Sequence, residues 1–165
     1  MVHKHIEDWH INSKVLDRTI EEIKKRVHID REHSIPYVAG YSKDGKTIYI
    51  DKDMPEFFID KRGKKILIDN YLILHEAVEK ALLDELKLLY QHAHQIAVRT
   101  EREAIEADGI DWDEYNTFME KWIKEISHDT KNVPKDLDLT PYKDEKDFKL
   151  LQQMTENFSL WKCLK

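Results

Sequence analysis

The chain has 165 residues, a length typical of one domain, and its composition of 41% hydrophobic and 36% charged residues is typical of a soluble globular protein. The formal net charge of -6 comes from intermixed acidic and basic residues without a basic cluster interleaved with aromatics, which argues against a nucleic-acid surface. No apolar run approaches the roughly 18 residues that cross a bilayer, and the single cysteine, Cys163, excludes an internal disulfide. We therefore expect a cytoplasmic protein without nucleic-acid or membrane partners.

The first half of the chain predicts a helix followed by a small sheet. Apolar residues recur at helical spacing over residues 12–28, and Ser13 is a plausible N-cap. Two strand-like segments follow, residues 37–42 and 46–51, and the Asp-Gly pair between them favours a β-hairpin. This half therefore predicts one helix and a small antiparallel sheet.

The second half predicts a bundle of helices. Strong periodicity indicates one helix from Asp69 to about Leu89 and a second over residues 90–107. A third helix starts at Asp111, where a Glu three residues later suggests a capping box. A short last helix is expected over residues 144–158.

The expected fold class is therefore α+β and mostly helical. We divide the chain into a domain over residues 1–131 and a C-terminal arm over residues 132–165. The arm has few apolar residues of its own, so we expect it to pack on the domain or on a partner, which allows an oligomer or an assembly.

The stretch LHEAVEKALL places polar residues on an apolar helix face. A helix advances about 100° per residue. With His75 at 0°, Glu79 falls at about 40°, inside the apolar arc, and Glu76 falls at about 100°, at the edge of that arc. On the next helix the same calculation turns His94 and Glu101 inward and His92 outward.

Buried carboxylates are costly unless they are paired or bound to a metal. A divalent cation between the two helices would satisfy these groups, and zinc accepts both imidazole nitrogen and carboxylate oxygen. We predict His75, Glu79 and His94 as zinc ligands, although another divalent metal would also suit them. Glu101 is predicted either as a fourth ligand or as the residue that orients His94.

Simpler interpretations stay open at this point. His75 and Glu79 could form a buried ion pair without metal or could each bond to other core groups, and Glu76 could form an i,i+4 ion pair with Lys80. Redox iron or manganese is a further alternative, but the Glu-x-x-His spacing of ferritin-like sites is missing from both helices.

Residues 37–101 resemble the core of zincin metallopeptidases, in which an edge strand precedes an H-E-x-x-H helix and a later segment supplies the third ligand. The matching elements are the strand-like IYID, the helix LILHEAVEKAL and the segment AHQIA. The resemblance implies that His75 is the first ligand, Glu76 the general base, Glu79 the second ligand in place of His, and His94 the third. The chain is also similar to short zincin-like proteins encoded by bacteriophages and mobile elements.

From this resemblance we expect a zinc-dependent hydrolase of the peptidase type, with an extended peptide substrate lying along residues 47–51. The alternative is a non-catalytic structural or interaction protein that keeps the scaffold, such as a phage virion or assembly component, which would place it in a virion. The Glu at position 79 favours this alternative, because a carboxylate ligand makes the metal less Lewis-acidic.

Overall fold

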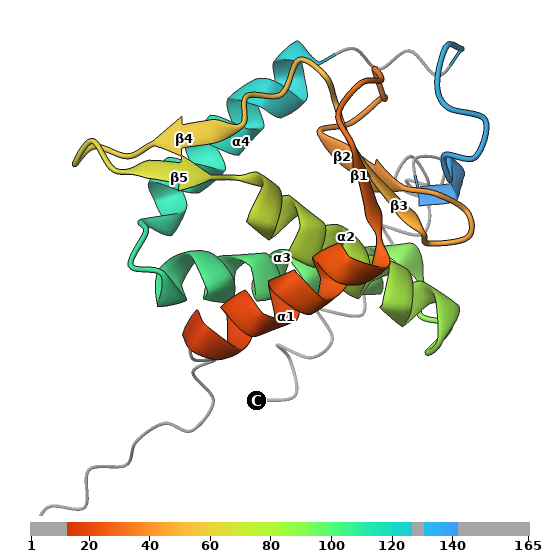
Figure 1. Ribbon diagram of the computed structural model, residues 1–165, viewed down its shortest axis with the longest axis horizontal. Coiled ribbons are helices and arrows are strands. Elements are labelled where there is room, and N and C mark those ends of the chain that lie inside the picture. Colours follow the sequence, from red (N-terminus) through yellow and green to blue (C-terminus); the bar gives the residue numbers. More distant parts are fainter. Residues whose placement is uncertain (1–12, 127–130, 142–165) are drawn as a thin grey trace, which may run out of the picture.

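A computed structural model describes residues 13–126 and 131–141 of the chain, and the arrangement of its elements is shown in Figure 1. The fold is α+β and mostly helical, as predicted. The described helices are α1 (Ser13–Arg26), α2 (Asp69–Asp84), α3 (Tyr90–Ala107) and α4 (Trp112–Glu125). The predicted helix over residues 144–158 lies outside the described residues.

The predicted hairpin is confirmed, within a sheet that is mixed rather than antiparallel. Strands β2 (Ala39–Tyr41) and β3 (Thr47–Ile50) pair antiparallel, and the turn between them includes Gly45 with a φ of 69°. Strand β1 (His28–Asp30) pairs in parallel with β3. The strand order is β1-β3-β2, so β3 is central and β2 lies at the edge.

A second hairpin was missed from the sequence. Strands β4 (Phe57–Ile59) and β5 (Lys65–Leu67) pair antiparallel, each over three residues, which is too short to give a clear alternating pattern. In Figure 1 this hairpin and the three-stranded sheet lie at opposite ends of the molecule, next to the helices.

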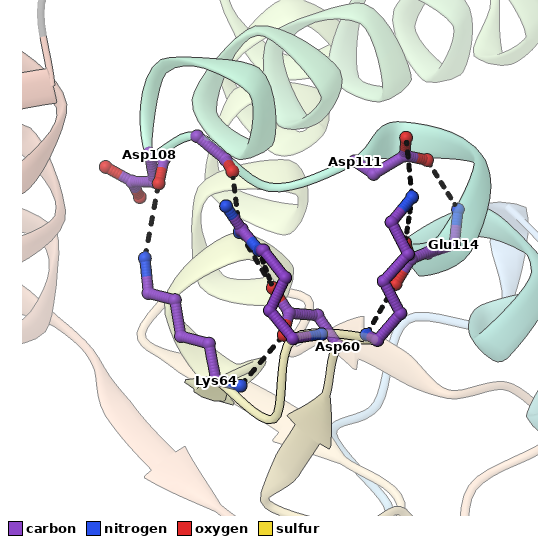
Figure 2. Close-up of polar contacts among 8 residues, drawn as sticks. Asp60, Lys64, Asp108, Asp111 and Glu114 are labelled. Atoms are coloured by element: carbon purple, nitrogen blue, oxygen red, sulfur yellow. Dashed lines mark hydrogen bonds and ion pairs between the residues drawn. The ribbon is translucent and has the colours of Figure 1, made fainter.

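Polar contacts tie the β4–β5 turn to the connection between α3 and α4 (Figure 2). The carboxylate of Asp60 accepts hydrogen bonds from the backbone N–H groups of Arg62 and Lys64, and from the Arg62 guanidinium. Arg62 and Lys64 in turn donate to the carbonyl oxygens of Gly109 and Asp108. The backbone N–H of Lys61 donates to the carboxylate of Glu114 in the first turn of α4, so the turn contacts both the end of α3 and the start of α4.

The helix boundaries differ from the prediction at one important place. Helix α2 ends at Asp84 and not near Leu89. The helix cannot continue to Leu89, because Lys87 has a left-handed backbone conformation with a φ of 53°. Leu86 and Leu89, which a helix continuing to Leu89 would place on the same face as His75, are 64% and 49% exposed. Asp111 is confirmed as the N-cap of α4, since its side chain accepts from the backbone N–H of Glu114 at 3.0 Å. The second bond of a capping box is not formed, because the Glu114 carboxylate accepts from the backbone N–H of Lys61.

Residues 131–141 pack against the outer edge of β2. Leu137 forms an antiparallel bridge with Ser42, and its side chain is buried with Ile35 and Tyr49. The backbone N–H of Asp138 donates to the carbonyl of Tyr41. This segment therefore covers part of the edge that β2 would otherwise present to solvent, as Figure 1 shows for the blue segment beside the sheet.

The main core joins α1, the sheet, the β4–β5 hairpin and the three later helices. Its buried residues include Leu16 and Ile20 of α1, Leu72 of α2, Ile105 of α3 and Tyr115 of α4. Within the described part of the chain, no helix is long and apolar enough to cross a membrane. The core packs against the face of the α2–α3 pair that carries the polar residues predicted as metal ligands.

We expect Asp60→Ala to destabilise the protein by about 1–3 kcal/mol, because the substitution leaves two backbone N–H groups of the turn without an acceptor. Chemical denaturation measures this loss. The matched control is Asp113→Ala, at an exposed position on α4, which should change the free energy of unfolding by less than about 0.5 kcal/mol. Equal effects of the two substitutions would contradict the role of Asp60.

Candidate metal centre

Helices α2 and α3 pack side by side and bury an unusual number of ionisable side chains between them. His75, Glu76 and Glu79 on α2 are 8%, 7% and 3% exposed, and Glu101 on α3 is 6% exposed. The inward orientation predicted for His75, Glu79 and Glu101 is therefore confirmed. His94 lies at the mouth of the site, with 42% of its side chain exposed, and His92 is exposed as predicted.

Three of these residues form a compact group of potential metal ligands. The Nδ1 atom of His94 lies 2.8 Å from Oε2 of Glu79, and the Nε2 atom of His75 lies 3.5 Å from the same oxygen. One ligand atom from each residue lies within 4.8 Å of the other two. Ligand atoms around a tetrahedral zinc are about 3.3 Å apart, given metal–ligand distances of about 2.0 Å. The group therefore fits a small divalent ion with little rearrangement.

Glu101 lies behind His75 and not beside His94. Its Oε2 atom is 2.8 Å from Nδ1 of His75. His94 is seven residues away on the same helix, which corresponds to a rise of about 10.5 Å, so Glu101 is too far along α3 to orient it. A carboxylate that accepts from Nδ1–H leaves Nε2 of His75 available to a metal. Glu101 is also not part of the three-residue ligand group found among the described residues.

Glu76 is buried more deeply than the sequence indicated. The predicted alternative for this residue, an ion pair with Lys80, is wrong: the Lys80 ammonium instead contacts Asp84 at 3.2 Å and Asp138 at 3.7 Å. Among the described residues no side chain donates a hydrogen bond to Glu76. Burial, reinforced by the negative charge of Glu79, raises the pKa of Glu76 to about 8.

The electrostatics of the other groups follow from their contacts. Burial alone would lower the pKa of His75, but hydrogen bonds with Glu101 and Glu79 outweigh it and raise the pKa well above its ordinary value. Burial alone would raise the pKa of Glu79, but hydrogen bonds with His75 and His94 lower it to about 2. Without a metal, these shifts favour an ionised Glu79 beside a protonated His75, and they favour the protonated form of Glu76.

Two tyrosines bind the carboxylates of the cluster, and neither was singled out as a site residue from the sequence; a third, Tyr90, has its hydroxyl 3.4 Å from Nδ1 of His94. The Tyr41 hydroxyl donates to Oε1 of Glu79 at 3.1 Å, and the Tyr115 hydroxyl donates to Oε1 of Glu101 at 2.7 Å. Both side chains are buried. A signal was present, because a tyrosine on a buried face usually has a polar partner for its hydroxyl.

A cavity of about 200 Å³ opens at the cluster. Its walls come from β2, α2, α3 and α4, with Asp138 and Pro141 of the C-terminal segment at its edge. The apolar part of its lining includes Leu72, Val98, Met119 and Ile123, with Trp112 and the tyrosines. Helix α4 therefore faces the cluster across the cavity.

The strand that faces the cavity is β2, not β3. Residues 37–41 line the cavity, whereas β3 lies between β1 and β2 with a paired strand on each side. The prediction that a substrate strand would lie along residues 47–51 is therefore wrong, because the backbone groups of β3 already bond to its two neighbours. Sequence order suggested β3 because it is the strand nearer to the metal-site helix.

Comparisons with known proteins leave the site to be interpreted from its own geometry. No protein family, curated protein or solved structure matches this chain.

The zinc-free protein should become less stable as the pH rises from about 5 to about 8. Glu76 and His75 have raised pKa values, so the folded state keeps protons that the unfolded state has already released, and the free energy of unfolding falls with pH. Glu79 acts in the opposite sense, but only between its folded pKa of about 2 and its ordinary value of 4.5. Denaturant unfolding of chelator-treated protein at several pH values measures this slope.

Glu76→Gln should make the slope shallower and should stabilise the zinc-free protein at pH 8 by at least about 1.4 kcal/mol, the equivalent of one unit of pKa shift. Glu85→Gln, at an exposed position after α2, is the matched control and should leave the slope unchanged. A wild-type slope in the Glu76→Gln variant would contradict the burial of an uncompensated carboxyl at position 76.

Proposed function

We propose that the protein is a zinc-dependent hydrolase, most simply a peptidase, with the metal held between α2 and α3 by His75, Glu79 and His94. The observation that carries this proposal is the convergence of two imidazoles and one carboxylate within 4.8 Å at a cavity. Glu101 supports it by holding Nδ1 of His75, which leaves Nε2 directed toward the other two ligands.

The composition of the ligand set removes the objection that a carboxylate at position 79 makes the metal unsuited to catalysis. The sequence pattern places Glu where an H-E-x-x-H helix has its second His, but the complete set here is still two His and one Glu. Sets of this composition occur in catalytic zinc sites, where a water completes the coordination. The total charge at the metal would thus be the usual one, although the carboxylate comes from a different position in the chain.

Zinc in this site would polarise a carbonyl group and lower the pKa of a bound water. Glu76 is the candidate general base, because its carboxyl lies beside the ligands and lines the cavity without a hydrogen-bond donor among the described side chains. A nearby cation favours the ionised form of a carboxyl, so zinc binding would bring the pKa of Glu76 down from about 8 toward the range suited to catalysis near neutral pH. We propose the cytoplasm as the compartment, in keeping with a single cysteine.

Protein purified without chelators should contain one equivalent of zinc per chain. His75→Ala and His94→Ala should each lose tight zinc binding, because each removes one of three ligands. His92→Ala is the matched control, since His92 lies on the same helix as His94 but is exposed. Elemental mass spectrometry of the three variants gives the answer, and equal zinc content in all of them would refute the proposed ligand set.

Glu76→Gln should keep zinc but lose hydrolysis of a peptide library by about 100-fold or more, because the amide does not accept a proton from water. Mass spectrometry of the library before and after incubation detects cleavage, with apo-protein as the blank. Unchanged cleavage by the Gln variant would exclude Glu76 as the base.

One observation favours the alternative of a non-catalytic protein that uses the metal for structure. Residues 136–138 already pair with the edge of β2 next to the cavity, through Lys43 and Tyr41. An extended peptide would use that edge to add a strand. A chain with stoichiometric zinc that cleaves no peptide, and an oligomer that is lost on removing residues 142–165, would support this alternative over hydrolysis.

A further inference from the structure

The two carboxylates at the centre use their oxygens in the same way. In Glu79, Oε1 accepts from the Tyr41 hydroxyl, whereas Oε2 faces the imidazoles of His94 and His75. In Glu101, Oε1 accepts from the Tyr115 hydroxyl, whereas Oε2 faces His75. One oxygen of each carboxylate is thus bound by a tyrosine, and only the other is directed toward the histidines.

The different partners of the two oxygens matter because the last torsion of a glutamate side chain has broad energy minima. An unrestrained Glu79 could rotate to offer both oxygens to one cation. A hydrogen bond to a charged acceptor is among the stronger hydrogen bonds in proteins, and it is enough to hold one orientation in a buried site. The phenol is a rigid donor, and burial together with nearby carboxylates raises the pKa of both tyrosines far above neutrality, so both keep their protons.

Each tyrosine reaches its carboxylate from a different element. Tyr41 belongs to β2 and binds a residue of α2, and Tyr115 belongs to α4 and binds a residue of α3. Tyr41 is 2% exposed and Tyr115 is fully buried. The elements that form the walls of the cavity therefore also fix the side chains at its centre.

We propose that Tyr41 and Tyr115 are positioning residues of the metal centre: Tyr41 keeps Glu79 as a single-oxygen ligand, and Tyr115 holds Glu101 in the orientation that directs Nε2 of His75 toward the metal. This inference rests on the proposed metal site. It assigns the two tyrosines no contact with metal or substrate, and it explains how three ligands leave a coordination position open for water.

The experiment uses the full chain and the variants Tyr41→Phe and Tyr115→Phe, each of which removes one hydroxyl and keeps the ring. Tyr49→Phe is the matched control, because Tyr49 is also buried, at 5% exposed, and its hydroxyl also bonds a carboxylate, that of Asp136, away from the cavity. Zinc affinity is measured by competition with a chromophoric chelator. Cobalt substitution reports coordination number, since the visible bands weaken as the number of ligand atoms increases.

Tyr41→Phe should weaken zinc binding by about 10–100-fold, the range typical for groups that orient a ligand, and should weaken the cobalt bands as Glu79 becomes bidentate. Tyr115→Phe should weaken binding by up to about 10-fold without changing the bands, because it acts one residue further from the metal. Its effect should vanish in a Glu101→Ala background, which a general loss of stability would not do. Tyr49→Phe should leave zinc affinity and the cobalt bands as in the wild type.

The outcomes separate this inference from the function on which it rests. Wild-type protein that binds no zinc would overturn the metal site and the positioning role together. Wild-type protein that binds zinc tightly, with Tyr41→Phe and Tyr115→Phe equal to Tyr49→Phe in affinity and spectrum, would overturn the positioning role and leave the metal site in place.

Discussion

The burial of His75, Glu76, Glu79 and Glu101 between α2 and α3 is the constraint around which the rest of the structure is organised. A desolvated charge is tolerated only where it has partners. Three elements around this region supply such partners: β2 gives Tyr41, α4 gives Tyr115 and the first turns of α3 give His94. Glu76 is the exception, since no described side chain donates to it. A bound cation would compensate the negative charge of the carboxylates that lack such a partner.

The sequence was most informative where one periodicity applied over many residues. The 100° rotation per residue identified the inward face of α2 and α3 and therefore His75, Glu79 and Glu101. It was less informative about burial: it placed Glu76 at the edge of the apolar face, because a rotation angle does not include the other elements that pack around the helix. His94 was assigned to the buried face by the same angle, although it lies near the start of α3 where the cavity opens.

The features that could not be predicted depend on contacts between distant segments. Strands β1, β4 and β5 have three residues each, so their identity comes from pairing and not from local pattern. The pairing of Glu101 with His75 instead of His94 depends on the relative position of two helices along their axes. Likewise, the partners of the Tyr41 and Tyr115 hydroxyls lie 38 and 14 residues away, beyond the range of any local motif.

The candidate ligands themselves all lie between residues 75 and 94, on a single helical hairpin with a short connection. The entropy lost in closing such a connection is small, and contacts within it belong to the fastest class in folding. The tyrosines come from strands and helices that must first dock on that hairpin. The ligands of the centre are thus close together in the sequence, whereas the residues that orient them belong to elements packed around the hairpin. Loosening β2 or α4 would leave the imidazoles and carboxylates together but free to rotate, so order in these surrounding elements, more than the presence of the ligands, determines the geometry available to a metal.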